Sequence, residues 1–148
     1  MLKIGILLGD DIGLEVVPEA VKVMKAAARK SGLDIEWQEL PIGKRGHELH
    51  GHTMPVETVA ALEKIDGFLC GPIGHAAYPR NDPTWIMPPL RKRLDLYASI
   101  KPVRSYSNIP SVHKNVDIVF LREVTEGMQS SDTVVAGAGE FRPNDEIT

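Results

Sequence analysis

The sequence predicts an α/β fold built on a parallel sheet. Short apolar runs at residues 2–8, 33–40 and 66–71 are typical of strands, and amphipathic helical segments at 14–31 and 55–64 lie between them. Consecutive parallel strands need long crossover connections, which helices usually supply. The chain has 148 residues, of which 43% are hydrophobic and 25% charged, so it can bury a core of ordinary size.

The first strand and helix carry the clearest patterns. The apolar run from Leu2 to Leu8 ends at a glycine, as expected for a buried strand. Pro18 is expected in the first turn of the helix that follows, where its missing N–H is tolerated, and Gly32 is expected to end that helix. Apolar side chains recur at helical spacing at Val17, Ala20, Val21, Met24, Ala27 and Ala28.

The rest of the chain predicts shorter elements. Residues 41–53 are polar and glycine-rich, which indicates a loop, and 71–83 indicate a second loop. We expect a short helix or turn over 90–97 and extended segments over 98–106 and 116–122. After residue 126 no clear period is visible.

The end of the sequence carries no capping element. Parallel sheets occur almost only with both faces covered, and the predicted sheet has few strands. We therefore expect a truncated chain, or one that a partner completes.

Composition excludes several classes of function. A net charge of -3 and an aromatic content of 5% argue against a nucleic-acid surface. Cys70 is the single cysteine, so no disulfide can form within the chain, which fits a reducing cytoplasm. The apolar start is too short for a signal peptide or a membrane span. We expect a cytoplasmic protein that binds neither nucleic acid nor a membrane.

Two glycine-containing loops are expected at one edge of the sheet. The segment Gly9–Gly13 follows the first strand but lacks the G-x-G-x-x-G spacing and a P-loop lysine, so a tight turn is favoured over a ligand contact. The segment Gly71–His75 follows the third strand. Because the carboxyl ends of parallel strands meet at the same edge, the two loops together predict a crevice there.

The segment from Pro89 to Arg104 holds five cations in an apolar frame. On periodicity alone a solvated amphipathic helix followed by a strand is favoured. The alternative is a set of held cations that clamps an anion. The five are Arg91, Lys92, Arg93, Lys101 and Arg104.

Arg122 ends a later strand and can project into the same crevice as Arg91 and Lys101. Three converging cations suit a small dicarboxylate or hydroxy acid. The alternative is that Arg122 pairs with Glu123 or Glu126.

The histidines suggest a metal site only weakly. His47, His50 and His52 do not match the H-E-x-x-H spacing, and a solvated loop is the better interpretation.

The residues resemble the N-terminal part of the β-decarboxylating dehydrogenases, the family of isocitrate, isopropylmalate, homoisocitrate and tartrate dehydrogenases. Five segments occur in the family's order and at similar spacing, so the resemblance extends along essentially the whole chain. They are Leu8–Val16, Gly71–Gly74, Leu90–Tyr97, Lys101–Arg104 and Arg122–Gly127.

The resemblance implies an isopropylmalate dehydrogenase-like fold: a three-layer α/β domain with a parallel sheet, followed by the beginning of a second α/β domain. Residues 1–99 would belong to the cofactor-side domain and 100–148 to the second domain. In that second domain, residues 126–141 would begin an arm that pairs with another subunit, so a homodimer or other homo-oligomer is expected.

The resemblance also implies oxidation of a 2-hydroxy acid by NAD or NADP, usually with loss of the β-carboxylate. Mg²⁺ or Mn²⁺ would polarise the hydroxyl, with ligands expected in a missing C-terminal part. This chain alone is therefore expected to be inactive.

Particular residues receive roles by the same resemblance. The substrate carboxylates would bind Arg91, Lys101 and Arg122. The variable substituent of the substrate would lie near Thr84, Met87 and Pro88. The nicotinamide half of the cofactor would lie near Ile12, Ile73, Gly74 and His75.

Three departures from the family pattern matter. Lys101 stands where the family has arginine, which keeps the charge but loses the bidentate fork. Gln129 stands at the position of the catalytic tyrosine and cannot act as an acid or base. Trp85 and Met87 replace polar residues of the isocitrate enzymes, which argues against isocitrate as the substrate. Pro88 with Pro89 is unlike an isopropylmalate pocket, so a tartrate-like enzyme or one for an uncharacterised 2-hydroxy acid is favoured. A truncated homologue without catalysis, acting as a ligand-binding or regulatory subunit, is the alternative.

Overall fold

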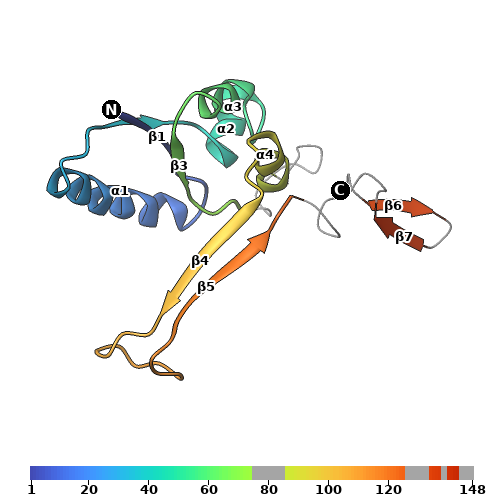
Figure 1. Cartoon of the computed structure of the whole chain (residues 1–148). Coiled ribbons are helices and arrows are strands. Elements are labelled where there is room, and N and C mark those ends of the chain that lie inside the picture. Colours follow the sequence, from blue (N-terminus) through green and yellow to red (C-terminus); the bar gives the residue numbers. More distant parts are fainter. Residues whose placement is uncertain (75–85, 126–133, 138–139, 144–148) are drawn as a thin grey trace. The chain divides into compact units, whose positions relative to one another are not determined.

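The computed structural model describes residues 1–74, 86–125, 134–137 and 140–143 (Figure 1). The chain divides into two compact units, Met1–Ile86 and Met87–Thr148, and each is described by itself. None of the described helices is both long and apolar enough to cross a membrane. The division into functional domains at residue 99 stays a prediction.

The first unit is a three-stranded parallel sheet with the order β2-β1-β3. Ile4 of β1 lies opposite Trp37 of β2 and Gly67 of β3. The predicted α/β fold with a parallel sheet is thereby confirmed. The elements in chain order are β1 (Leu2–Leu7), α1 (Gly13–Lys30), β2 (Ile35–Glu39), α2 (Gly43–His50), α3 (Val56–Leu62) and β3 (Gly67–Cys70).

Helices lie on both faces of this sheet, with α1 on one side and α2 and α3 on the other (Figure 1). On the α1 side, Ile6 of β1 forms a buried cluster with Val17 and Val21. On the other side a Cβ added to Gly5 would lie 2.8 Å from Ile65 Cδ1 and 3.3 Å from Leu62 Cδ2. The small residue thus lets the end of α3 approach the strand closely, and the unit has three layers.

Helix α1 begins earlier than its sequence pattern indicates. It starts at Gly13, so Pro18 lies in the second turn and the prediction of a first-turn proline is wrong. Pro18 has no N–H to donate to the carbonyl of Leu14. The predicted stop is correct, because Gly32 has a φ of +67° and the N–H of Leu33 donates to the Ala28 carbonyl at 2.9 Å, as in a Schellman motif.

Helix α2 lies within residues 41–53, so the prediction of a loop there is wrong. The helix buries glycines where most helices bury apolar side chains. A Cβ on Gly46 would meet Pro55 Cδ at 3.0 Å and the carbonyl oxygens of His52 and Thr53 at 3.1 Å. A helix that packs through its glycine backbone has no apolar period for a sequence pattern to show.

The second unit begins with α4 (Met87–Arg93) and continues with the antiparallel pair β4 (Ala98–Arg104) and β5 (Asp117–Glu123). Helix α4 also ends in a Schellman motif, with Asp95 at a φ of +54° and the N–H of Leu96 donating to the Arg91 carbonyl at 2.8 Å. The strands β6 (Val134–Gly137) and β7 (Glu140–Pro143) pair antiparallel. They fall in or next to the segment that the resemblance assigns to an intersubunit arm, and that assignment stays a prediction.

Candidate functional site

The strand order places a candidate crevice at the carboxyl ends of β1 and β3. From the central strand β1, one crossover leads outward to β2 and the next returns past β1 to β3. In open parallel sheets, ligands bind where the direction of winding reverses, outside the carboxyl ends of the strands. The loops that follow β1 and β3 form this edge.

The two loops are packed against each other through their glycines. The N–H of Asp10 donates to the Pro72 carbonyl at 2.7 Å. A Cβ on Gly9 would lie 2.2 Å from the Pro72 oxygen, and one on Gly71 would lie 2.0 Å from the Leu8 oxygen. Both glycines are therefore needed for the approach of the loops, which agrees with the tight-turn interpretation of Gly9–Gly13.

A buried carboxylate lies at the centre of this edge. Asp10 is 5% exposed. Its Oδ1 accepts a hydrogen bond from the N–H of Lys44 at 2.8 Å, and its Oδ2 accepts one from the N–H of Gly74 at 2.9 Å. The sequence pattern did not single out Asp10, because its partners are backbone groups far away along the chain.

The residues expected near the nicotinamide lie on these two loops. Ile12 is the N-cap residue of α1 and is 55% exposed, while Ile73 and Gly74 are partly buried on the facing loop. His75 lies outside the described residues. An exposed isoleucine beside a fixed loop can offer an apolar contact to a flat ring.

Cys70 is the last residue of β3 and directly precedes the Gly71–Gly74 loop. Burial, with a smaller contribution from the nearby charge of Asp10, raises the pKa of the Cys70 thiol above its usual value. The thiol is therefore protonated at neutral pH, and Cys70 is a poor nucleophile.

The strand register of the second unit brings two of the three predicted cations to one face. Lys101 lies opposite Phe120, and Ser99 lies opposite Arg122. Residues two apart on a strand share a face, so Lys101 and Arg122 are diagonal neighbours. Diagonal neighbours lie within reach of long side chains.

The other cations of the segment from Pro89 to Arg104 do not share the face of Lys101 and Arg122 on the ribbon. Arg104 lies on the opposite face of the ribbon, where it forms an ion pair with Asp117 at 2.7 Å. Arg91 is a partly buried residue of α4, whereas Lys92 and Arg93 are exposed.

Among the other predicted site residues, Met87 is the first residue of α4 and is partly buried. Thr84 and Gln129 lie outside the described residues.

Glu123 and Glu126 are the alternative partners that the sequence suggests for Arg122, and the structure describes Glu123. The carboxylate of Glu123 accepts hydrogen bonds from the N–H of Thr125 at 2.7 Å and from its hydroxyl at 2.6 Å. Glu123 lies opposite Ala98, on the face of the ribbon away from Arg122. Glu126 lies outside the described residues.

Within the described part of the chain, no group of three His, Cys, Asp or Glu side chains is placed to hold a metal ion. His47 and His50 lie on α2, and the Nδ1 of His50 is 3.7 Å from a carboxylate oxygen of Glu57.

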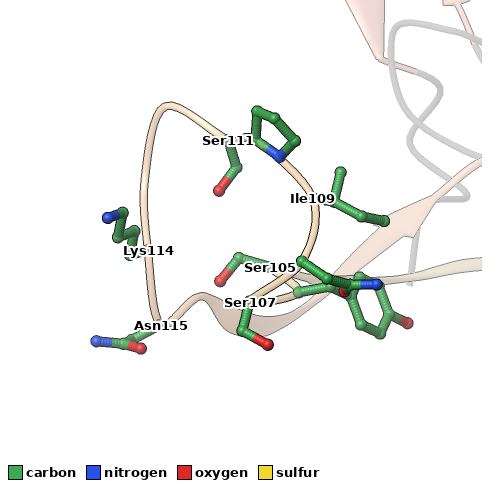
Figure 2. Close-up of a pocket in the computed structure, with 9 residues that line it drawn as sticks. Ser105, Ser107, Ile109, Ser111, Lys114 and Asn115 are labelled. Carbon is green, nitrogen blue, oxygen red and sulfur yellow. The ribbon is translucent and has the colours of Figure 1, made fainter.

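An open hollow of about 860 Å³ lies at the loop that joins β4 to β5 (Figure 2). Its lining includes Ser105, Ser107, Ser111 and Asn115, all from this one loop. In Figure 2 the side chain of Lys114 points away from the loop. Ligand pockets bury most of their ligand, and a hollow within a single exposed loop does not do so.

Comparisons with known proteins agree with the geometry. The family model described as isocitrate/isopropylmalate dehydrogenase matches residues 3–141. The 3-isopropylmalate dehydrogenase of Desulfitobacterium hafniense is 36% identical over 140 residues, which cover 86% of this chain and 40% of the relative. The NADP isocitrate dehydrogenase of Haloferax volcanii is 34% identical over 146 residues, which cover 94% of this chain and 33% of that relative.

Solved structures show the same likeness. The isocitrate dehydrogenase of Methylococcus capsulatus has a TM-score of 0.72 at 29% identity, over 87% of this chain and 36% of that one. A β-decarboxylating dehydrogenase of Thermococcus kodakarensis has a TM-score of 0.61 at 25% identity, over 97% of this chain and 40% of that one. The chain spans about 40% of the length of the first curated relatives it matches.

Proposed function

Because the chain belongs to the isocitrate/isopropylmalate dehydrogenase family, we propose that it takes part in the NAD(P)-dependent oxidation, usually an oxidative decarboxylation, of a 2-hydroxy acid such as isopropylmalate or tartrate. The chain spans about 40% of the length of its curated relatives, and the activity of the whole enzyme is proposed from this part. The names of the relatives include both isopropylmalate and isocitrate dehydrogenases, and the substrate proposed here rests on this chain's own residues.

The observation that carries the proposal is the placement of Lys101 and Arg122 on one face of the β4–β5 ribbon. Two cations within reach of each other can hold the carboxylates of one small acid through charge-assisted hydrogen bonds. Arg122 can hold a carboxylate with two parallel hydrogen bonds, whereas Lys101 provides a single charge. Arg91 of α4 is the third proposed cation, and Met87 of the same helix would contact the variable part of the acid.

The loops after β1 and β3 would hold the nicotinamide half of NAD or NADP. They are fixed against each other, and the exposed Ile12 offers an apolar surface beside Ile73 and Gly74. NAD(P) supplies the hydride acceptor of this chemistry. Ile12 and Ile73 would orient the ring and keep water away from it.

A divalent cation would serve as the Lewis acid that polarises the substrate hydroxyl. The described residues do not form a group that fits Mg²⁺ or Mn²⁺. Ligands for this cation are therefore proposed outside them.

A second copy of the chain is the proposed partner. The β4–β5 ribbon exposes large apolar side chains on both faces, including Ile100 at 64% and Phe120 at 55%. A two-stranded ribbon is at best marginally stable without a packed face. A homodimer would cover part of this apolar surface.

One sequence feature favours a second function. Gln129 replaces the tyrosine that the resemblance places there, and an amide cannot transfer a proton. A homologue that binds the acid without turning it over, as a ligand-binding or regulatory subunit, would retain the cations and lose the tyrosine.

Activity and binding assays separate the two functions. The protein, purified in the form in which its own cells make it, is given NAD⁺ or NADP⁺, Mn²⁺, and isopropylmalate, tartrate or isocitrate in turn. Reduction of the nicotinamide with one acid supports the dehydrogenase. Calorimetric binding of an acid without reduction supports the second function, and neither binding nor reduction contradicts both.

A further inference from the structure

We propose that Asp10 is a positioning residue, whose buried carboxylate joins the N-terminus of α2 to the Gly71–Gly74 loop and so fixes the conformation of that loop. The coupling itself is a property of the described structure. Its consequence for nicotinamide binding rests on the proposed function.

The carboxylate joins two segments that are distant along the chain. Oδ1 accepts from the N–H of Lys44, which is 34 residues away, and Oδ2 accepts from the N–H of Gly74, which is 64 residues away. Asp10 is 5% exposed, so water competes little for either oxygen. Hydrogen bonds to an ionised acceptor are about twice as strong as neutral ones.

Helix α2 depends on Asp10 for a cap. Its N-cap residue is Ile42, which makes no side-chain capping hydrogen bond. Lys44 is the second residue of the helix, and its N–H is one of the donors that a capping side chain usually satisfies. The carboxylate of Asp10 replaces that cap from another element, and the positive end of the helix dipole favours its charge.

The same carboxylate holds the far end of the cofactor-side loop. The N–H of Gly71 donates to Leu7 at 2.8 Å, and the Pro72 carbonyl accepts from Asp10 at 2.7 Å, so the start of the loop is fixed by the backbone. Gly74 lies beyond these contacts, and its N–H donates to Oδ2. A Cβ on Gly74 would lie 2.5 Å from Asp11 Oδ2, so this end of the loop lies close to the turn after β1.

The variant Asp10→Asn tests this role with little change in shape. One oxygen becomes an NH₂ group, so a donor faces either the N–H of Lys44 or that of Gly74. Asp66→Asn is the matched control, because Asp66 Oδ2 accepts from the N–H of Lys3 at 2.7 Å in an exposed position. Asp66 lies just before β3, at the opposite end of the strand from Gly74.

Amide hydrogen exchange, followed by NMR, reads the coupling directly. In Asp10→Asn we expect exchange at Lys44 or Gly74 to be about tenfold faster or more, because one buried donor loses its acceptor. Exchange at Gly71 should keep the wild-type rate, and Asp66→Asn should change neither Lys44 nor Gly74. Unchanged rates at both Lys44 and Gly74 would overturn the proposal, as would an equal acceleration of all amides including Gly71.

Titration with NADH, followed by nicotinamide fluorescence, reads the consequence for the cofactor. In Asp10→Asn we expect about tenfold weaker binding and a smaller change in the emission of the bound nicotinamide, whereas Asp66→Asn should match the wild type. Wild-type affinity and emission in Asp10→Asn would overturn the role of Asp10 in cofactor positioning. If the wild type does not bind NADH, the proposed function fails, and the exchange rates still decide whether Asp10 fixes the loop.

Discussion

Replacing Gly71 with alanine tests whether the two loops of the candidate crevice are fixed by their close approach. The added Cβ would lie 2.0 Å from the Leu8 carbonyl oxygen and 2.9 Å from Val17 Cγ2. The loops would have to separate by about 1 Å or more to restore ordinary contact. Gly71 does not adopt the left-handed backbone conformation, so the strain would come from the lack of space alone.

The magnitude follows from what that separation disrupts. The loops are joined by the hydrogen bonds from Asp10 to Pro72 at 2.7 Å and from Gly71 to Leu7 at 2.8 Å. Each contributes on the order of 1 kcal/mol, and overpacking adds about 1–3 kcal/mol. Together these contributions predict that Gly71→Ala lowers the free energy of unfolding by about 3–5 kcal/mol.

Urea unfolding, followed by circular dichroism, measures this loss. Gly67→Ala is the matched control, since Gly67 begins the strand that ends directly before Gly71, and its Cβ would meet only Ile4 Cδ1, at 3.7 Å. We expect that control to lie within about 0.5 kcal/mol of the wild type. If the two variants unfold at the same urea concentration, the loops are not held by close approach and the account of the crevice is wrong.

Three further predictions concern the side chains of Cys70 and Asp95. Because burial raises the pKa of Cys70, a thiol reagent at neutral pH should modify the native chain far more slowly than the chain in urea, and equal rates would contradict the burial. The same raised pKa should make the wild type lose stability relative to Cys70→Ala as the pH rises from the unfolded towards the folded pKa, whereas below the unfolded value the difference between the two should stay constant, as unfolding titrations would show. Asp95 has a φ of +54° at the end of α4, so Asp95→Gly should raise the free energy of unfolding by about 0.5–1 kcal/mol. Thermal unfolding measures that gain, and a loss would contradict the Schellman assignment.

The sequence predicted the parts of the fold that bury apolar side chains at regular spacing. The strands and α1 were predicted because residues such as Ile6, Val17 and Val21 repeat with the period of their element. Helix α2 was missed because it packs through Gly43 and Gly46, which leave no apolar period. Pro18 was misplaced because the first turn of α1 consists of residues whose side chains are mostly exposed.

The candidate site was predictable only in part, for a related reason. Loops at the carboxyl ends of parallel strands meet by topology, so the contact between the loops after β1 and β3 followed from the strand pattern. Asp10 was missed because its partners are backbone N–H groups 34 and 64 residues away, which no local pattern reveals. The shared face of Lys101 and Arg122 depends on the register of β4 with β5, which the separate strand patterns do not specify.

The central claim is that the cation-bearing face of the β4–β5 ribbon binds a small acid, and calorimetric titration with tartrate and isopropylmalate tests it most directly. Arg122→Gln removes a cation from this face, whereas Arg104→Gln removes one from the opposite face of the same ribbon, where Arg104 pairs with Asp117. We predict about tenfold or greater weakening for Arg122→Gln and no more than about twofold for Arg104→Gln. Equal affinities of the two variants for both acids would contradict the account.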